Sequence, residues 1–186
     1  MEQKETSRQE ISRVLISVSD KSGIEVLSRA LSDKGIEIIS TGGTSRVISD
    51  TGVAVRPVEE VTNFPEMMGG RVKTLHPLIF GGILGRDSDQ KQMLKHNIDK
   101  IDMVICNLYP FKDAADKGVD LASLIEEIDI GGPSLLRAAS KNHSRVSVVT
   151  DPADYGWIIE EISKGGLTLE QRQQLALKSF RHTAEY

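Results

Sequence analysis

Short apolar runs that alternate with segments of helical period constrain the fold of this chain more than any other feature. The strand-like runs are Val14–Val18, Ile36–Ile39, Val53–Val55, Met103–Cys106 and Val146–Val149. Between them apolar residues recur at helical spacing, as in Ile24–Leu31. Such alternation is typical of a mostly parallel sheet with helices on both faces. No internal repeat or linker interrupts the pattern, so the sequence predicts a single α/β domain.

The composition excludes several classes of protein. A chain of 186 residues with a formal net charge of −4 lacks the broad basic surface that non-specific nucleic-acid binding requires. Cys106 is the one cysteine, which leaves no internal disulfide framework and no multi-cysteine zinc site. No apolar run reaches the roughly 18 residues of a membrane span, and the polar start MEQKETSRQE is unlike a signal peptide. We therefore expect a cytoplasmic protein without nucleic-acid or membrane partners.

Polar residues and glycines follow three of the predicted strands, in Ser17–Lys21, Thr41–Thr44 and Cys106–Tyr109. In open parallel sheets ligands bind outside the carboxyl ends of the strands, so the three segments are expected to meet in one crevice. Thr41–Thr44 also opens a helix, where free N–H groups and the helix dipole favour a phosphate. Taken alone, a Gly-Gly turn at such a place is more often ordinary turn chemistry, and the established nucleotide-binding fingerprints are absent.

The stretch MMGGRVKTLHP, residues 67–77, sets Arg71, Lys73 and His76 between a glycine pair and a proline. Alone, it fits a surface loop with incidental charges as well as it fits an anion site. Next to three strand ends that converge, the anion site becomes the stronger interpretation.

Two further charged residues belong to the region of a predicted helix over Ser134–Asn142, one before it and one near its end. Asp129 stands between apolar residues before Gly131-Gly132, and Lys141 lies near the helix end. A hydrated loop aspartate and a lysine favoured by the helix dipole are the simpler interpretations of these two residues. The four histidines lack metal-ligand spacing, so no metal site is predicted.

Six motifs, in order, carry a resemblance to a known family. They read SVSDKSG, STGGT, NFPEMMGGRVKTLHP, CNLYPF, IDIGGPSLLRAASKNH and LALKSFRHTAEY. From Val14 to Tyr186 the chain closely resembles the N-terminal domain of the bifunctional purine-biosynthesis family, which combines phosphoribosylaminoimidazolecarboxamide formyltransferase with IMP cyclohydrolase. The resemblance implies a methylglyoxal-synthase-like three-layer sandwich that closes 5-formamidoimidazole-4-carboxamide ribotide to IMP with loss of water, the last step of de novo purine biosynthesis. No cofactor is implied.

The resemblance also implies how the protein is organised. Residues 1–186 form one IMP cyclohydrolase domain, and the formyltransferase domain that follows in the family lies outside this chain. The last predicted helix runs to Tyr186 without a capping residue, which favours the N-terminal part of a longer protein. A homodimer is expected for the full-length protein.

The resemblance assigns a ribotide site to the predicted crevice. Its residues are Ser19, Asp20, Lys21, Thr41, Gly42, Gly43, Thr44, Arg71, Val72, Lys73, Thr74, Cys106, Asn107, Asp129 and Ile130. Lys21, Arg71 and the amides of the turn are suited to neutralise a phosphate, and arginine grips such a group in bidentate fashion. Asn107 has the paired donor and acceptor that a carboxamide needs.

For the chemistry, the resemblance points to Lys141 as proton donor and acceptor, oriented by Asp129. Lys73 and Tyr109 are expected to assist at the reacting oxygen. A helix rises about 1.5 Å per residue, which separates Asp129 from Lys141 by roughly 10 Å unless the chain folds back.

Two other functions share part of this site. A methylglyoxal-synthase-like regulatory domain that binds a phosphorylated effector needs the Thr41–Thr44 turn but not the remaining residues. Methylglyoxal synthase itself needs the phosphate site but acts on a triose phosphate and has no use for a nucleobase site.

Overall fold

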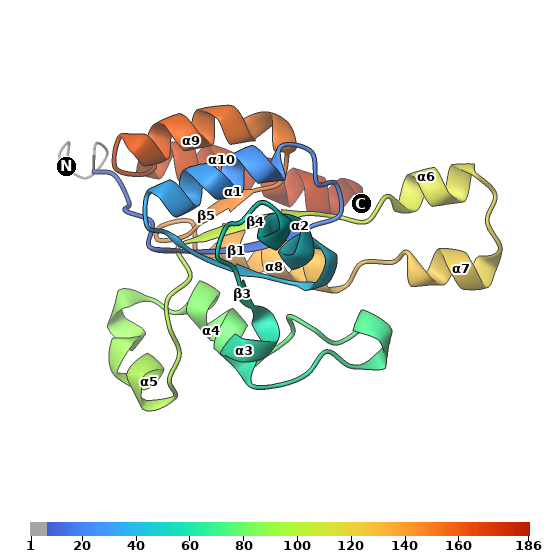
Figure 1. Ribbon diagram of the computed structural model, residues 1–186, viewed down its shortest axis with the longest axis horizontal. Coiled ribbons are helices and arrows are strands. Elements are labelled where there is room, and N and C mark those ends of the chain that lie inside the picture. Colours follow the sequence, from blue (N-terminus) through green and yellow to red (C-terminus); the bar gives the residue numbers. More distant parts are fainter. Residues whose placement is uncertain (1–6) are drawn as a thin grey trace.

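A five-stranded parallel sheet forms the centre of the computed structural model, which describes residues 7–186 (Figure 1). The strands are β1 (Arg13–Val18), β2 (Glu37–Ser40), β3 (Arg56–Pro57), β4 (Met103–Asn107) and β5 (Ser147–Val149), in the order β3-β2-β1-β4-β5. Every neighbouring pair is parallel. The prediction of an α/β sandwich around a parallel sheet is thereby confirmed.

Helices cover both faces of the sheet (Figure 1). The larger ones are α1 (Ile24–Asp33), α2 (Gly42–Asp50), α4 (Pro77–Leu84), α8 (Gly131–Lys141), α9 (Tyr155–Ser163) and α10 (Leu169–Glu185). The shorter ones are α3 (Val58–Thr62), α5 (Gln90–Lys95), α6 (Phe111–Asp116) and α7 (Leu121–Glu126). Helix α1 packs against α9, and α8 packs against α10 and α4. Helices α6 and α7 extend from the body as an arm (Figure 1).

The central strands are buried because they are apolar on both faces. Val14, Leu15 and Ile16 of β1 have no exposed surface, and every residue of β4 is buried. Near-continuous apolar runs are what a parallel strand between two helical layers requires. The sheet ends where these buried strands end, and the polar loops begin at that edge.

The strand predicted at Val53–Val55 is wrong by a few residues. Those residues form a loop, and the two-residue strand β3 begins at Arg56 and pairs with Ile39 and Ser40. The helix predicted from Ser134 begins earlier, at Gly131. Pro133 fits in its first turn because the N–H groups there have no partner within the helix.

Candidate functional site

The loop after β1 is fastened to the end of β4 by one side chain. Asn107 Oδ1 accepts hydrogen bonds from the backbone N–H groups of Ser19 at 2.7 Å and Asp20 at 2.8 Å. Its Nδ2 donates to the Asp20 carbonyl at 2.9 Å. Both polar atoms of Asn107 are thus engaged with the loop. In this structure Asn107 joins the end of β4 to the loop after β1. Its contact with a substrate carboxamide stays a prediction.

The Asp20 side chain turns towards the start of α1. Its Oδ1 accepts from the Ser22 N–H at 2.9 Å and from the Ser22 hydroxyl at 2.6 Å, and these bonds lower the pKa of the Asp20 carboxyl. The backbone of Ser19–Asp20, rather than the carboxylate, therefore faces Asn107.

The Thr41–Thr44 turn is anchored to β1 through its two threonines. The Thr41 hydroxyl lies 3.1 Å from the Ser17 hydroxyl, and the Thr44 hydroxyl donates to the Val18 carbonyl at 3.0 Å. Thr41 precedes the first helical residue of α2, so the N–H groups of Gly42 and Gly43 open that helix. Such N–H groups have no partner inside the helix and are oriented to bind an anion.

Two lysines lie over this turn. A Cβ atom on Gly42 would stand 2.7 Å from Lys73 Nζ, and one on Gly43 would stand 3.8 Å from Lys21 Cε. Gly42 also has a φ of +41°, which other residues rarely adopt. Glycine at this position therefore allows the ammonium group of Lys73 to reach the helix start. Lys21 Nζ is held nearby by the Ser19 carbonyl at 3.2 Å.

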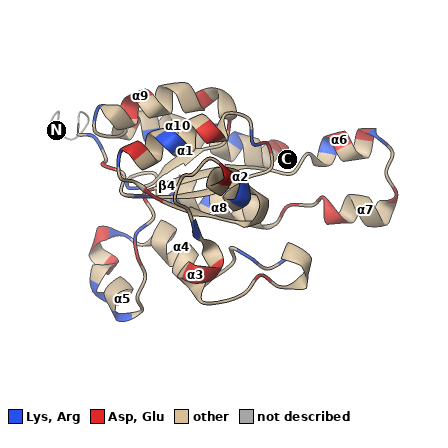
Figure 2. Ribbon diagram, in the orientation of Figure 1, with Lys and Arg blue, Asp and Glu red and all other residues tan. Residues whose placement is uncertain are grey.

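Both cations of the MMGGRVKTLHP loop have carboxylate partners. Lys73 Nζ lies 2.6 Å from Glu66 Oε2, and the Arg71 guanidinium pairs with Glu126 at the end of α7. The Glu126 carboxylate raises the pKa of Arg71, and Arg71 in turn lowers that of Glu126. The loop and the arm project from the same side of the body (Figure 1), and the loop carries the positive charges of Arg71 and Lys73 (Figure 2). Arg71 therefore points to the arm and not to the Thr41–Thr44 turn.

The same loop closes on itself and reaches α8. The backbones of Met67 and Val72 form an antiparallel bridge, which uses the N–H and C=O of Val72. Thr74 is buried, and its Oγ1 would lie 3.3 Å from a Cβ on Gly131. Thr74 thus joins the loop with the cations to the start of α8.

Asp129 stands at the start of α8, beside the end of β4. Its Oδ1 accepts from the Gly132 N–H at 2.7 Å. Burial raises the pKa of this carboxyl, against hydrogen bonds from the backbone of Gly132, Tyr109 and Gly131 that lower it. A Cβ on Gly132 would come within 2.5 Å of Asp129 Oδ2, so the close approach requires glycine. The carboxyl is therefore held in place and poised to take up a proton more readily than an ordinary aspartate.

Three other predicted residues surround Asp129. Burial, with the Asp129 carboxylate nearby, raises the pKa of the Cys106 thiol, which keeps it neutral. Tyr109 is 49% exposed and Ile130 is 62% exposed. These two side chains are open to a ligand at the carboxyl end of β4.

Lys141 lies at the other end of α8. This 11-residue helix spans about 15 Å at about 1.5 Å per residue. Asn142, the next residue, donates to the carbonyls of Ile83 and Gly85 at the end of α4. The exposed Lys141 is therefore remote from Asp129, and the expectation that Asp129 orients it is not met within one chain. That expectation came from the family resemblance, whereas the spacing in the sequence indicated a separation of roughly 10 Å unless the chain folds back. Helix α8 is continuous from Gly131 to Lys141 and does not fold back.

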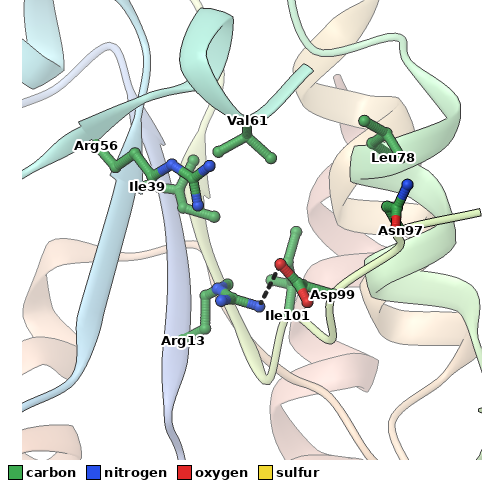
Figure 3. A pocket seen from close by; sticks show the side chains of 8 residues that line it. All are labelled: Arg13, Ile39, Arg56, Val61, Leu78, Asn97, Asp99 and Ile101. Carbon is green, nitrogen blue, oxygen red and sulfur yellow. Dashed lines mark ion pairs between the residues drawn. The ribbon is translucent and has the colours of Figure 1, made fainter. Parts of the chain in front are cut away.

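A partly open cavity of about 250 Å³ lies elsewhere, between the sheet and the segments around α3 and α4 (Figure 3). It is lined by Arg13, Ile39, Arg56, Val61, Leu78, Asn97, Asp99 and Ile101. Arg13 pairs with Asp99 at 3.6 Å across it. None of the predicted site residues lines this cavity. The candidate site residues instead follow the carboxyl ends of the strands, at one edge of the sheet.

Sequence reasoning missed three residues of this region. Glu66 and Glu126 neutralise Lys73 and Arg71, and the hydroxyl of Tyr186 binds the backbone of Asp129. Glu66 stands in the same motif as the cations, and that proximity was a usable signal. The other two are far along the chain from their partners, and no local pattern marks them.

Within residues 7–186 no group of three or more His, Cys, Asp and Glu side chains is arranged to hold a metal ion. Over the same residues, no helix has both the length and the apolar character needed to cross a membrane.

Comparison with known proteins places the chain in a family. Residues 23–134 match the model of the MGS-like domain, and residues 139–186 match that of the AICARFT/IMPCHase bienzyme. The bifunctional purine biosynthesis protein PurH of Aquifex aeolicus is 51% identical over 94% of the chain, and that of Lactococcus lactis subsp. cremoris (strain MG1363) is 56% identical over 94%. The chain spans 35% and 34% of the lengths of these relatives, about a third.

A solved structure agrees over nearly the whole chain. The crystal structure of ForH has a TM-score of 0.84 and 36% identity, and the match covers 94% of this chain and 92% of that one. The resemblance seen in the motifs is confirmed by the PurH relatives, and the predicted fold by the match to the domain model. That model covers more than half of the chain, and the chain therefore belongs to the MGS-like domain family.

Proposed function

We propose that this chain is an IMP cyclohydrolase domain that closes 5-formamidoimidazole-4-carboxamide ribotide to IMP with loss of water. The observation that carries the proposal is the placement of the Thr41–Thr44 turn, two lysines and the half-buried Asp129 carboxyl at one edge of the sheet. The similarity to PurH, a bifunctional purine biosynthesis protein, supports the same activity.

The turn supplies the phosphate site. The N–H groups of Gly42 and Gly43 offer hydrogen bonds, and Lys21 and Lys73 offer two positive charges within reach of them. Charged hydrogen bonds of this kind contribute about 1.5–3 kcal/mol each. Arg71 would join them only after leaving Glu126, so its part in binding depends on a rearrangement of an exposed ion pair.

The ring closes when the carboxamide nitrogen attacks the formyl carbon. A C–N bond forms and the formyl oxygen becomes an alkoxide and then a hydroxyl. Two protons leave nitrogen, one from the carboxamide and one from the formamide, and both end on this oxygen. Water leaves as the C–O bond breaks and the ring C=N bond forms. An amide nitrogen is a poor nucleophile, so a base that removes its proton lowers the barrier. Asp129, with its raised pKa, takes this role in our proposal, and it can return the proton to the departing hydroxyl.

Two other predicted site residues, Lys73 and Tyr109, are suited to stabilise the negative charge that develops on the formyl oxygen. Lys73 Nζ carries a charge to the crevice, and Tyr109 presents a half-exposed hydroxyl at the end of β4. A positive charge or an O–H directed at a developing alkoxide stabilises the transition state more than the ground state. Lys141 stands at the far end of α8 from Asp129, so its predicted proton role is not part of this proposal and stays a prediction. The reaction as written consumes no cofactor.

The proposal also covers how the activities are divided between domains. Residues 1–186 would form one cyclohydrolase domain, with formyl transfer residing in a separate domain of the longer relatives. A homodimer of the full-length protein remains a prediction from the resemblance, and a cytoplasmic location remains a prediction from the composition.

Mixing the purified chain with the formylated ribotide and following IMP absorbance tests this function. Steady formation of IMP supports it. Tight binding of a phosphorylated ligand without turnover would instead favour the regulatory domain, and release of methylglyoxal from a triose phosphate would favour the synthase. Folate-dependent formylation by this chain would contradict the domain assignment.

A further inference from the structure

The segment that carries Asp129 is an exposed connection between two helices, in which the Gly132 N–H binds the Asp129 carboxyl. Residues 127–130 link α7 to α8, and their apolar side chains Ile128 and Ile130 are 47% and 62% exposed. An exposed connection has no packing to fix its backbone. The Asp129 carboxyl, however, must hold one position to serve as a base, because small displacements of a catalytic group cost large factors in rate.

One hydroxyl holds this segment from outside. Tyr186 Oη accepts from the Asp129 backbone N–H at 2.9 Å and donates to the Glu127 carbonyl at 3.1 Å. A single O–H group thus binds the backbone on both sides of Ile128. The two bonds span 57 and 59 residues of sequence.

The helix that presents Tyr186 is itself fixed. Helix α10 begins with a capping box between Thr168 and Gln171, and its buried residues Leu175 and Ala176 belong to the core. It packs along α8, the same helix that Asp129 begins. Tyr186 follows the last residue of this helix, where its N–H binds the His182 carbonyl at 3.1 Å.

The ring of Tyr186 also adjoins the carboxyl. Burial is the largest cause that raises the pKa of the Tyr186 phenol, and the nearby carboxylates of Asp129 and Glu127 raise it further. The titratable groups that face Asp129 are thus Cys106 and Tyr109 from the end of β4 and Tyr186 from α10, with Glu127 beside the last. Asp129 is half-buried next to these groups, of which Tyr109 and Tyr186 are themselves 49% and 39% exposed.

We propose that Tyr186 is the positioning residue of Asp129: its hydroxyl clamps the backbone of residues 127–129 and thereby sets where the Asp129 carboxyl stands. This role rests on the proposed cyclohydrolase function, although the clamp itself does not. Tyr186 touches no reacting atom and acts only through Asp129.

The test compares Tyr186→Phe with Tyr186→Ala in the full 186-residue chain. Phe keeps the ring but removes both hydrogen bonds, and Ala removes the ring as well. Thr183→Val is the matched control, because the Thr183 hydroxyl in the same turn of α10 binds only the Phe180 carbonyl of its own helix.

We expect the amide of Asp129 to exchange with solvent about twofold to tenfold faster in Tyr186→Phe, as for the loss of one hydrogen bond. With ring closure as readout, kcat should fall by about the same factor or more while KM stays within about twofold. Thr183→Val should leave all three quantities at the wild-type value.

The pKa of Asp129, measured by NMR without substrate, separates the effect of the Tyr186 hydrogen bonds on the backbone from the effect of the Tyr186 ring on the burial of the carboxyl. Tyr186→Ala admits water, so it should move this raised pKa down towards the ordinary range, whereas Tyr186→Phe should leave it raised. An Asp129 amide that exchanges at the wild-type rate in Tyr186→Phe overturns the clamp. Unchanged kcat beside faster exchange overturns the positioning role. Absence of turnover in the wild-type chain overturns the proposed function, and with it the positioning role, while the exchange data still decide the clamp.

Discussion

The two sides of the candidate crevice are built in different ways. The Thr41–Thr44 turn is tied to β1 by hydroxyls of buried threonines, and Asn107 ties the neighbouring loop to β4. On the other side, Arg71 and Glu126 meet as an ion pair in which both side chains are 60% exposed. Buried hydrogen bonds rigidify, whereas exposed ion pairs contribute about 0–1 kcal/mol and open easily.

This difference assigns separate tasks to the two sides. A preorganised anion site loses little entropy when it binds a ligand, so the turn is suited to hold the phosphate in one place. The loop with Lys73 and the arm with Glu126 are suited to rearrange around the rest of the ribotide. The anchored side should therefore dominate affinity, and the start of α8 should dominate chemistry.

The largest expected effect separates the two ends of α8. Asp129→Asn should lower kcat by about 10²–10⁴, the usual scale for one general acid–base group. Lys141→Met, at the far end of the same helix, should stay within about tenfold of the wild type, since the two residues lie about 15 Å apart along the helix. Equal losses in the two variants would mean that Lys141 from a second chain completes the site.

The pH dependence of kcat sharpens the same comparison. A base must be deprotonated to act, so activity should be lost as pH falls through the pKa of Asp129. Because burial raises that pKa, the acid limb of the profile should lie above the ordinary value of 3.8. The limb should disappear in Asp129→Asn and be unchanged in Lys141→Met.

A smaller effect is expected at the anchored turn. Gly42→Ala combines a strained φ of +41° with a Cβ only 2.7 Å from Lys73 Nζ, so the ammonium must move away. Loss of one charged hydrogen bond corresponds to a roughly tenfold to hundredfold weaker affinity for IMP, measured by calorimetry. Gly43→Ala is the matched control, because its Cβ meets Lys21 Cε at an ordinary 3.8 Å. Similar affinities for the two variants would contradict a rigid phosphate site.

The smallest effect on affinity is expected at the exposed Arg71–Glu126 ion pair. Glu126→Gln frees Arg71, and IMP should bind up to about fivefold more tightly, in line with the small value of exposed ion pairs. Glu127→Gln changes the adjacent carboxylate and should have no such effect. Weaker IMP binding in Glu126→Gln would show that the Arg71–Glu126 pair supports the bound state.

Much of this architecture was predictable from the sequence, for physical reasons. Val14–Val18 and Met103–Cys106 are apolar at every or nearly every position, which is the pattern of buried parallel strands, and polar residues follow each of them. Parallel strands end at the same edge, so Lys21, the Thr41–Thr44 turn and Asn107 were expected to meet there.

The remaining features depend on geometry that no local pattern encodes. Arg71 and Glu126 are 55 residues apart, and Asp129 and Tyr186 are 57 apart. Such pairs depend on how whole helices pack. The sequence did indicate that Lys141 stands apart from Asp129, by roughly 10 Å for a helix that begins at Ser134. The observed helix begins at Gly131, which makes the helical stretch between them longer.

The central claim, that the anchored turn is the phosphate site, is tested most directly by NMR. The backbone amides of the 186-residue chain are followed while inorganic phosphate, and then IMP, is added. We predict that the signals of Gly42 and Gly43 move most with both ligands, and that the amide of Asp129 responds to IMP alone. Shifts centred on Arg13 and Arg56, which line the cavity of Figure 3, with Gly42 and Gly43 unmoved, would contradict the account.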